Sequence, residues 1–177
     1  MRDRLVAGVL CLALVLGLLP AAGLVQPAEA AYWADPYGQQ LVEWGVMRGD
    51  ISGNLNLANP ITRAEFVTMC NRAFGYTKLG AMPFTDVVST DWYAEDINIA
   101  YNAGYFKGTS AAGNLASPNA RLTREQAAVM LARNMLLRET TGESLGFSDS
   151  RTLNEWSRGL IGAAVAEGVL TGYSDGS

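Results

Sequence analysis

The sequence predicts an all-α protein built from tandem helix–loop–helix repeats, of which the third is incomplete. Three observations support this fold class: a tryptophan–glycine spacing that occurs three times, a Thr-Arg helix start that occurs twice, and a composition rich enough in apolar residues to form a packed core. The chain has 177 residues, of which 49% are hydrophobic and 17% charged, and its formal net charge is -4. This composition is typical of a globular protein and excludes a disordered acidic tail.

Each repeat is expected to begin with a helix led by a tryptophan. Trp33, Trp92 and Trp156 are each followed twelve residues later by a glycine and four residues after that by another. The positions eight and nine residues after each tryptophan are almost all apolar, as expected for one face of a helix. The first glycine suits a left-handed helix end, and the second suits a tight turn. The three glycine pairs are Gly45 and Gly49, Gly104 and Gly108, and Gly168 and Gly172.

The second helix of the repeat has a strong start signal in two places. Ile-Thr-Arg-Ala-Glu at residues 61–65 and Leu-Thr-Arg-Glu-Gln at residues 122–126 each precede a long apolar run. In both, a threonine stands three residues before a glutamate or glutamine, which is the pattern of a capping box. The helix-capping residues are therefore predicted to be Thr62, Glu65, Thr123 and Gln126. Because a single hairpin cannot bury its apolar face, we expect two or three repeats to pack together.

The arginines of these two motifs are unusual. Arg63 and Arg124 occupy the first position of a helix, where a cation is disfavoured by the helix dipole by about 0.3–1 kcal/mol. An arginine beside free helix N–H groups makes a good anion pocket, and its planar guanidinium suits a carboxylate. An ion pair with Asp86 or Asp149 of a neighbouring repeat explains the same pattern equally well.

Residues 1–30 are predicted to be a secretory signal peptide. Arg2 and Arg4 precede an uncharged apolar stretch over residues 5–19, and Ala28-Glu29-Ala30 offers small residues at a cleavage site. We expect cleavage after Ala30 and export of the mature chain. An uncleaved membrane anchor is the alternative, because the uncharged stretch is long enough to span a bilayer. Contact with a membrane is otherwise not expected.

Composition limits the chemistry that the chain can perform. The sequence contains no histidine and two cysteines, which excludes Ser-His-Asp and Cys-His catalysis and histidine-ligated zinc. The acidic balance argues against nucleic acid as a partner, and we expect no cofactor and no metal site. A glycosidase would need two placed carboxylates. The densest acidic cluster lies around a helix start, where such residues usually serve as caps; it comprises Asp86, Asp91, Glu95 and Asp96.

These motifs together resemble the S-layer homology family, whose triplet modules attach exported proteins to bacterial cell walls. The resemblance rests on the two Thr-Arg motifs, the Gly104 and Gly108 pair, and, in the second repeat, Phe84-x-Asp86 with Trp92 and Pro118-Asn119. It implies three helical units around a pseudo-threefold axis, with grooves between neighbouring units. We place the repeats at residues 31–77, 83–141 and 146–177. The first repeat lacks the Phe-x-Asp opening and carries Leu57 in place of the usual proline, and the third has no second helix.

The resemblance also implies a function without catalysis. Members of this family bind secondary cell-wall polysaccharide, which commonly carries a pyruvate ketal on an amino sugar. Arg63 and Arg124 would bind the carboxylate, and Trp92 and Trp156 would offer their faces to sugar rings, although packing between helices explains a tryptophan equally well. The glycines that would let the backbone approach the ligand are Gly104, Gly108, Gly168 and Gly172. The alternative function is self-assembly in a surface lattice with little affinity for glycan.

Overall fold

The fold was analysed in a computed structural model, which describes residues 32–109, 112–141 and 145–177; the predicted signal peptide lies outside them. Within these ranges the secondary structure is helical and contains no strand, which confirms the all-α class. No helix there is long and apolar enough to cross a bilayer. The elements are α2 (Asp35–Glu43), α3 (Arg63–Phe74), α4 (Ala94–Asn102), α5 (Arg124–Asn134), the short 3-10 helix η1 (Ser150–Thr152) and α6 (Glu155–Ala166).

Both predicted capping boxes are confirmed, and they set the starts of α3 and α5. The Oγ1 atom of Thr62 accepts a hydrogen bond from the backbone N–H of Glu65 at 3.2 Å, and the Glu65 carboxylate accepts the Thr62 N–H at 2.7 Å. Thr123 and Gln126 make the same pair of bonds, at 3.1 and 3.4 Å. Each box satisfies two N–H groups that the first turn of a helix leaves free.

The predicted glycine helix ends are also confirmed. Gly45, Gly104 and Gly168, which follow α2, α4 and α6, have φ angles of +70°, +86° and +66°, a region that favours glycine. The end of α5 differs from expectation. Its apolar run continues to residue 137, but the helix stops at Asn134 and Leu136 is 86% exposed with φ of +56°.

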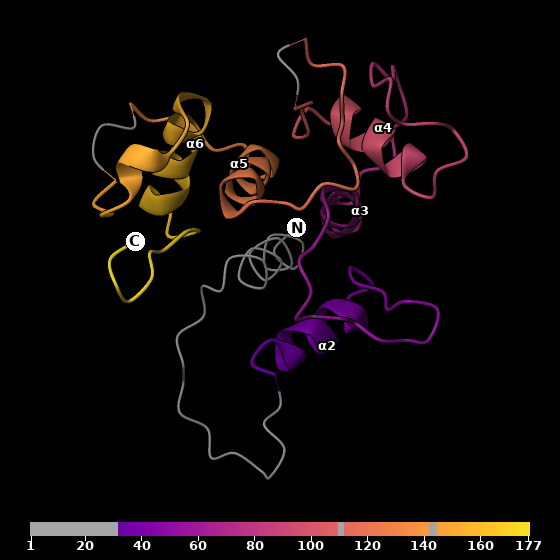
Figure 1. The fold of residues 1–177 in the computed structure, drawn as a ribbon, viewed down its shortest axis with the longest axis horizontal. Coiled ribbons are helices and arrows are strands. Elements are labelled where there is room, and N and C mark those ends of the chain that lie inside the picture. The colour runs from indigo at the N-terminus through magenta and orange to yellow at the C-terminus, as the bar shows by residue number, and fades with distance from the viewer. Residues whose placement is uncertain (1–31, 110–111, 142–144) are drawn as a thin grey trace.

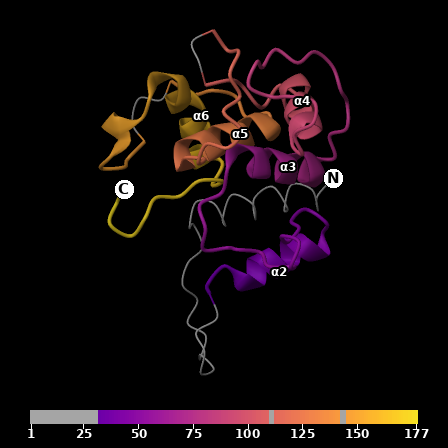
Figure 2. The same ribbon diagram turned by 45° about the vertical axis from the view of Figure 1, so that its right-hand side comes forward.

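The helices pack in an order that interlocks consecutive repeats. In Figure 1, α3 and α5 lie toward the middle of the molecule, with α2, α4 and α6 outside them. The strongest helix contacts join α3 to α4 and α5 to α6. Each Thr-Arg helix therefore packs more extensively against the first helix of the following repeat than against the first helix of its own. Figure 2 shows α2 set apart from α4, α5 and α6, with α3 as its nearest helix.

Most of the buried apolar side chains belong to one core that α3, α4, α5 and α6 share. Its largest fully buried members are Tyr105, Phe66, Phe106, Ile97, Leu131, Val67 and Val129. A smaller cluster joins α2 to the last turns of α3 and consists of Leu41, Val46, Met69 and Ala73. α2 is thus held by a smaller hydrophobic contact than the other helices, and its outer surface stays accessible.

Candidate functional site

Arg63 is buried at the junction between the first and second repeats. Its side chain is 3% exposed, and its Nε and Nη2 atoms donate to the carbonyl oxygens of Ala116 and Lys107 at 2.9 and 3.1 Å. The guanidinium lies 4.7 Å from the centre of the Phe106 ring. Burial lowers its pKa to about 10, an effect that the charge of Asp86 partly opposes. Arg63 therefore remains charged at neutral pH and holds the loop of the second repeat in place.

The backbone at the start of α3 is occupied by the same loop. The N–H groups of Arg63 and Ala64 donate to the carbonyl oxygens of Ala120 and Pro118, both at 3.0 Å. The carboxylate of Asp86 accepts from the loop backbone instead of pairing with Arg63 through a hydrogen bond. Protein carbonyl groups thus fill the place where we expected either an anion or an aspartate partner.

Arg124 occupies the matching position at the start of α5, but its side chain makes fewer hydrogen bonds with the described residues than that of Arg63. Its Nη2 atom donates to the carbonyl oxygen of Thr171 at 2.7 Å, and its guanidinium lies 4.0 Å from the centre of the Tyr173 ring. Thr171 corresponds to Lys107 in the repeat, since each directly precedes the second glycine of its pair. The Nε atom of Arg124 is buried and has no hydrogen-bond partner among the described residues. One strong donor is therefore left without an acceptor.

A groove of about 260 Å³ lies beside this arginine, between the start of α5 and the third repeat. Glu125 on its wall is already engaged, because its carboxylate accepts from the backbone and side-chain N–H groups of Asn154 at 2.9 and 2.8 Å. Polar, apolar and charged side chains line the groove, as in many ligand sites. The lining residues are Thr123, Arg124, Glu125, Ala128, Phe147, Asp149, Thr152, Leu153, Ile161, Leu170, Thr171, Gly172 and Ser177.

The structure brings only some of the predicted ligand residues to this groove. Gly172 lines it beside Arg124, whereas Trp92 and Trp156 lie on the outer surface, 63% and 51% exposed. Gly104 and Gly168 end their helices. At Gly108, an added Cβ would lie 2.7 Å from the Leu115 carbonyl oxygen, so the close approach that requires this glycine comes from the protein itself.

Three members of the acidic cluster have structural partners. Asp86 accepts from the backbone N–H groups of Ala116 and Ser117, both at 2.8 Å. The carboxylate of Asp91 accepts from the Val88 N–H at 2.9 Å, and Asp96 accepts from Thr68 Oγ1 at 2.9 Å. None of these bonds caps α4, whose start at Tyr93 has no side-chain cap hydrogen bond, so the capping role expected for this cluster is not confirmed; Asp86 binds a loop and Asp96 binds α3 instead.

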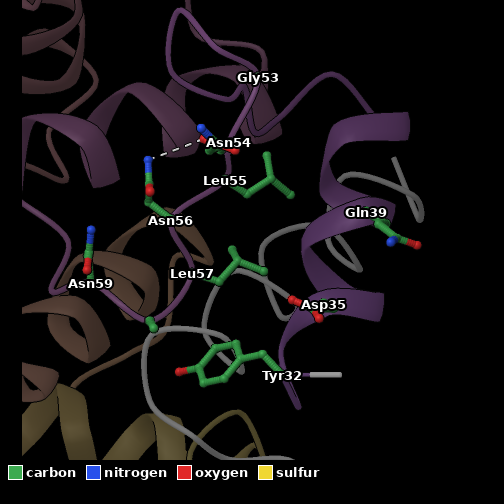
Figure 3. Close-up of a pocket in the computed structure, with 10 residues that line it drawn as sticks. Tyr32, Asp35, Gln39, Gly53, Asn54, Leu55, Asn56, Leu57 and Asn59 are labelled. Carbon is green, nitrogen blue, oxygen red and sulfur yellow. Dashed lines mark hydrogen bonds between the residues drawn. The ribbon is translucent and has the colours of Figure 1, made fainter. Parts of the chain in front are cut away.

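A second hollow, of about 540 Å³, lies in the first repeat between α2 and the loop over residues 53–59. Figure 3 shows Tyr32, Asp35 and Gln39 on its α2 side and the loop residues opposite. We name it the repeat 1 pocket. Sequence reasoning did not predict it, although the missing Phe-x-Asp of the first repeat was a signal that something there would differ.

Comparison with known proteins agrees with these motifs. Residues 83–128 match the S-layer homology domain family. This segment is an S-layer homology domain. It contains Trp92, the second Gly-x-x-x-Gly pair and the second Thr-Arg motif, and it includes Lys107 and Ala116, whose carbonyl oxygens accept from Arg63. Domains of this family are noncatalytic anchoring modules.

Relatives match the chain well beyond this segment. It is 34% identical over 163 residues to the Surface-layer 125 kDa protein of Lysinibacillus sphaericus, covering 87% of this chain and 14% of that protein. It is 28% identical over 179 residues to the S-layer protein sap of Bacillus anthracis, covering 97% and 22%. An amylopullulanase of Thermoanaerobacterium thermosulfurigenes is 30% identical over 145 residues, covering 79% and 8%. The chain thus spans a small part of each, and the similarity supports a cell-surface anchoring module.

Proposed function

We propose that the chain is a noncatalytic anchoring module that binds anionic secondary cell-wall polysaccharide in the groove beside Arg124. The observation that carries this proposal is the groove of about 260 Å³ that Arg124 lines, where its guanidinium donates to the Thr171 carbonyl oxygen and packs over the Tyr173 ring. At the matching position, the Nε atom of Arg63 donates to the Ala116 carbonyl oxygen. In this proposal a carboxylate oxygen of the polymer accepts a charge-assisted hydrogen bond from the Arg124 guanidinium.

The groove also suits a polymer of sugars. Tyr173 already stacks on the guanidinium, whereas Gly172 on the groove wall lies against Phe147, whose ring an added Cβ would meet at 2.5 Å. Trp92 and Trp156 offer exposed rings to further sugar units, since aromatic faces pack well against apolar faces of other molecules. In this proposal Arg63 acts by fixing the loop of the second repeat, and Arg124 contacts the ligand.

The test is co-sedimentation of the full chain with purified bacterial cell walls, before and after chemical removal of the polymer that is not peptidoglycan. We expect Arg124→Gln to weaken binding by about tenfold, since it removes a charge-assisted hydrogen bond. Arg138→Gln is the matched control, because Arg138 is exposed and lies outside the groove. Unchanged thermal unfolding of both variants would show that binding alone is affected.

Two outcomes would contradict the proposal. Binding that persists on walls stripped of the polymer would exclude it as the ligand. Binding that Arg124→Gln leaves unchanged, together with oligomers that grow with protein concentration in the absence of walls, would favour the alternative of self-assembly in a surface layer. Sedimentation velocity of the full chain at several concentrations measures the second.

A further inference from the structure

The segment over residues 84–86 fills a defined place in the second repeat. Phe84 is buried, with its ring 5.3 Å from Tyr101 and 5.6 Å from Phe106. The two oxygens of the Asp86 carboxylate accept the backbone N–H groups of Ala116 and Ser117, both at 2.8 Å. The loop of this repeat therefore contains a carboxylate site made of two adjacent N–H groups, which Asp86 occupies.

The segment that contains Phe84 and Asp86 lies along one face of α4. The Gly80 N–H donates to the Asn98 side chain at 2.9 Å, and the Asn102 side chain donates to the Ala81 carbonyl oxygen at 2.9 Å. The third repeat uses its own Phe-x-Asp in a similar place: the Ser148 N–H donates to the Gly176 carbonyl oxygen at 2.8 Å. In two of the three repeats, then, a Phe-x-Asp segment contacts the loop that follows the first helix.

The loop of the first repeat has the same frame as the loop of the second. The Asp50 N–H donates to the Asn54 carbonyl oxygen at 3.0 Å, and the Thr109 N–H donates to the Leu115 carbonyl oxygen at 2.8 Å. The residue two positions after the accepting carbonyl group has a left-handed backbone in both loops, with φ of +52° at Asn56 and +50° at Ser117. Leu55 and Asn56 therefore correspond to Ala116 and Ser117, whose N–H groups bind Asp86.

The carboxylate that this frame requires is missing from the described part of the first repeat. The backbone N–H groups of Leu55 and Asn56 have no acceptor within residues 32–109, 112–141 and 145–177. Residues 1–31 contain no phenylalanine, so no Phe-x-Asp precedes Trp33. The repeat 1 pocket lies at this place, between residues 53–59 and the face of α2 that corresponds to the face of α4 under the Phe-x-Asp segment (Figure 3).

An apolar side chain near the end of α2 occupies the position that corresponds to the Phe84 contact on α4. Val42, which lies on α2 outside the residues that line the pocket, corresponds to Tyr101, against which Phe84 packs; the two side chains are 43% and 36% exposed. Met47, which corresponds to Phe106, is partly buried against the small cluster that joins α2 to α3. An extended peptide with an aromatic residue two positions before an aspartate fits both requirements, because its ring would cover Val42 and its carboxylate would accept the two N–H groups.

We propose that the repeat 1 pocket binds an extended Phe-x-Asp segment of another polypeptide, whose carboxylate accepts the N–H groups of Leu55 and Asn56. Both Phe-x-Asp segments of this chain are already engaged in their own repeats. The site is distinct from the Arg124 groove and does not depend on the function proposed for it. It is a protein-docking site of the kind in which an added segment completes a repeat.

The test uses the full chain and a fluorescent synthetic peptide with the sequence of residues 79–91. We expect saturable binding, together with shifts of the Leu55 and Asn56 amide resonances in NMR spectra. Peptides that carry Asp86→Asn or Phe84→Ala should each bind about tenfold more weakly, since one loses the charged acceptor and the other the buried ring. The Arg124→Gln chain should bind the peptide normally, so that failure of this proposal and failure of the wall-binding proposal give different results.

A variant of the pocket sharpens the test. Asp35 lines the pocket, and its counterpart on α4 is Ala94. Removal of this negative charge in Asp35→Asn should tighten binding of the peptide several-fold, whereas Glu43→Gln, outside the pocket at the other end of α2, should not change it. Absence of saturable binding, equal binding of the Asp86→Asn peptide, or binding of a carboxylated wall saccharide that the peptide cannot displace would each overturn the proposal.

Discussion

The junctions at Arg63 and Arg124 begin with the same local sequence and end with different structures. Each arginine follows a capping threonine, donates to the carbonyl oxygen before a glycine, and lies over an aromatic ring. At Arg63 the loop of the next repeat adds the Ala116 carbonyl oxygen and buries the side chain; at Arg124 no described residue does so. Within the described residues, the same motif is closed by protein carbonyl groups at Arg63 and lies beside a groove at Arg124.

The largest expected effect of a substitution is at the closed junction. Arg63→Ala would leave the Ala116 and Lys107 carbonyl oxygens without donors in a buried place, and should lower the free energy of unfolding by about 3 kcal/mol. Arg124→Ala should lower it by less than about 1 kcal/mol, because that side chain is only partly buried. Urea denaturation of both variants, followed by circular dichroism, measures the difference.

A lysine variant separates charge from shape at the same position. Arg63→Lys keeps the cation but loses the planar fork that reaches two carbonyl oxygens at once, so most of the destabilisation should remain. Equal losses of stability for Arg63→Ala and Arg124→Ala would show that the two junctions do not differ in the way the structure indicates.

Asp86 and Asp149 extend the comparison to the second and third repeats. Asp86→Ala removes the acceptor of two loop N–H groups and should lower the free energy of unfolding by about 2 kcal/mol. Asp149 precedes η1 without a side-chain capping bond, so Asp149→Ala should change stability by less than about 0.5 kcal/mol. Thermal unfolding measures both. A loss at Asp149 as large as that at Asp86 would mean that the third repeat is closed as firmly as the second.

The sequence predicted those features that depend on a few neighbouring residues. The capping boxes at Thr62 and Thr123 require partners only three residues away, and the glycine helix ends require only a local backbone conformation, so both were found. The all-α class followed from the same local signals, because each apolar run has helical spacing and a marked start.

The features that escaped prediction depend on distant parts of the chain. Arg63 is buried because carbonyl oxygens 44 and 53 residues later reach it, and no local pattern shows that approach. The spacing of residues also could not show that α3 packs on α4, since loop lengths permit either neighbour. The repeat 1 pocket arises from a contact that the first repeat lacks, and a missing partner becomes visible only when the loops are compared in space.

The smallest expected effect concerns how the first and second loops are braced. In the first, the Asp50 carboxylate accepts from the Asn54 and Ser52 N–H groups and from the Asn56 side chain, and these bonds lower its pKa below the ordinary 3.8. In the second, the corresponding contact joins the hydroxyl groups of Thr109 and Ser117 at 2.7 Å, which do not titrate in acid.

A lowered pKa in the folded state means that the ionised carboxylate stabilises the loop above about pH 3.8. The stabilisation is lost as the pH falls through the folded-state pKa, so the Ser52 and Asn54 amide resonances should shift in NMR titrations with a midpoint below that value. Asp50→Asn should abolish the shift while keeping the shape of the side chain. A midpoint at or above the ordinary value would show that the carboxylate does not brace this loop in solution, and would remove the structural basis for matching Asn56 with Ser117.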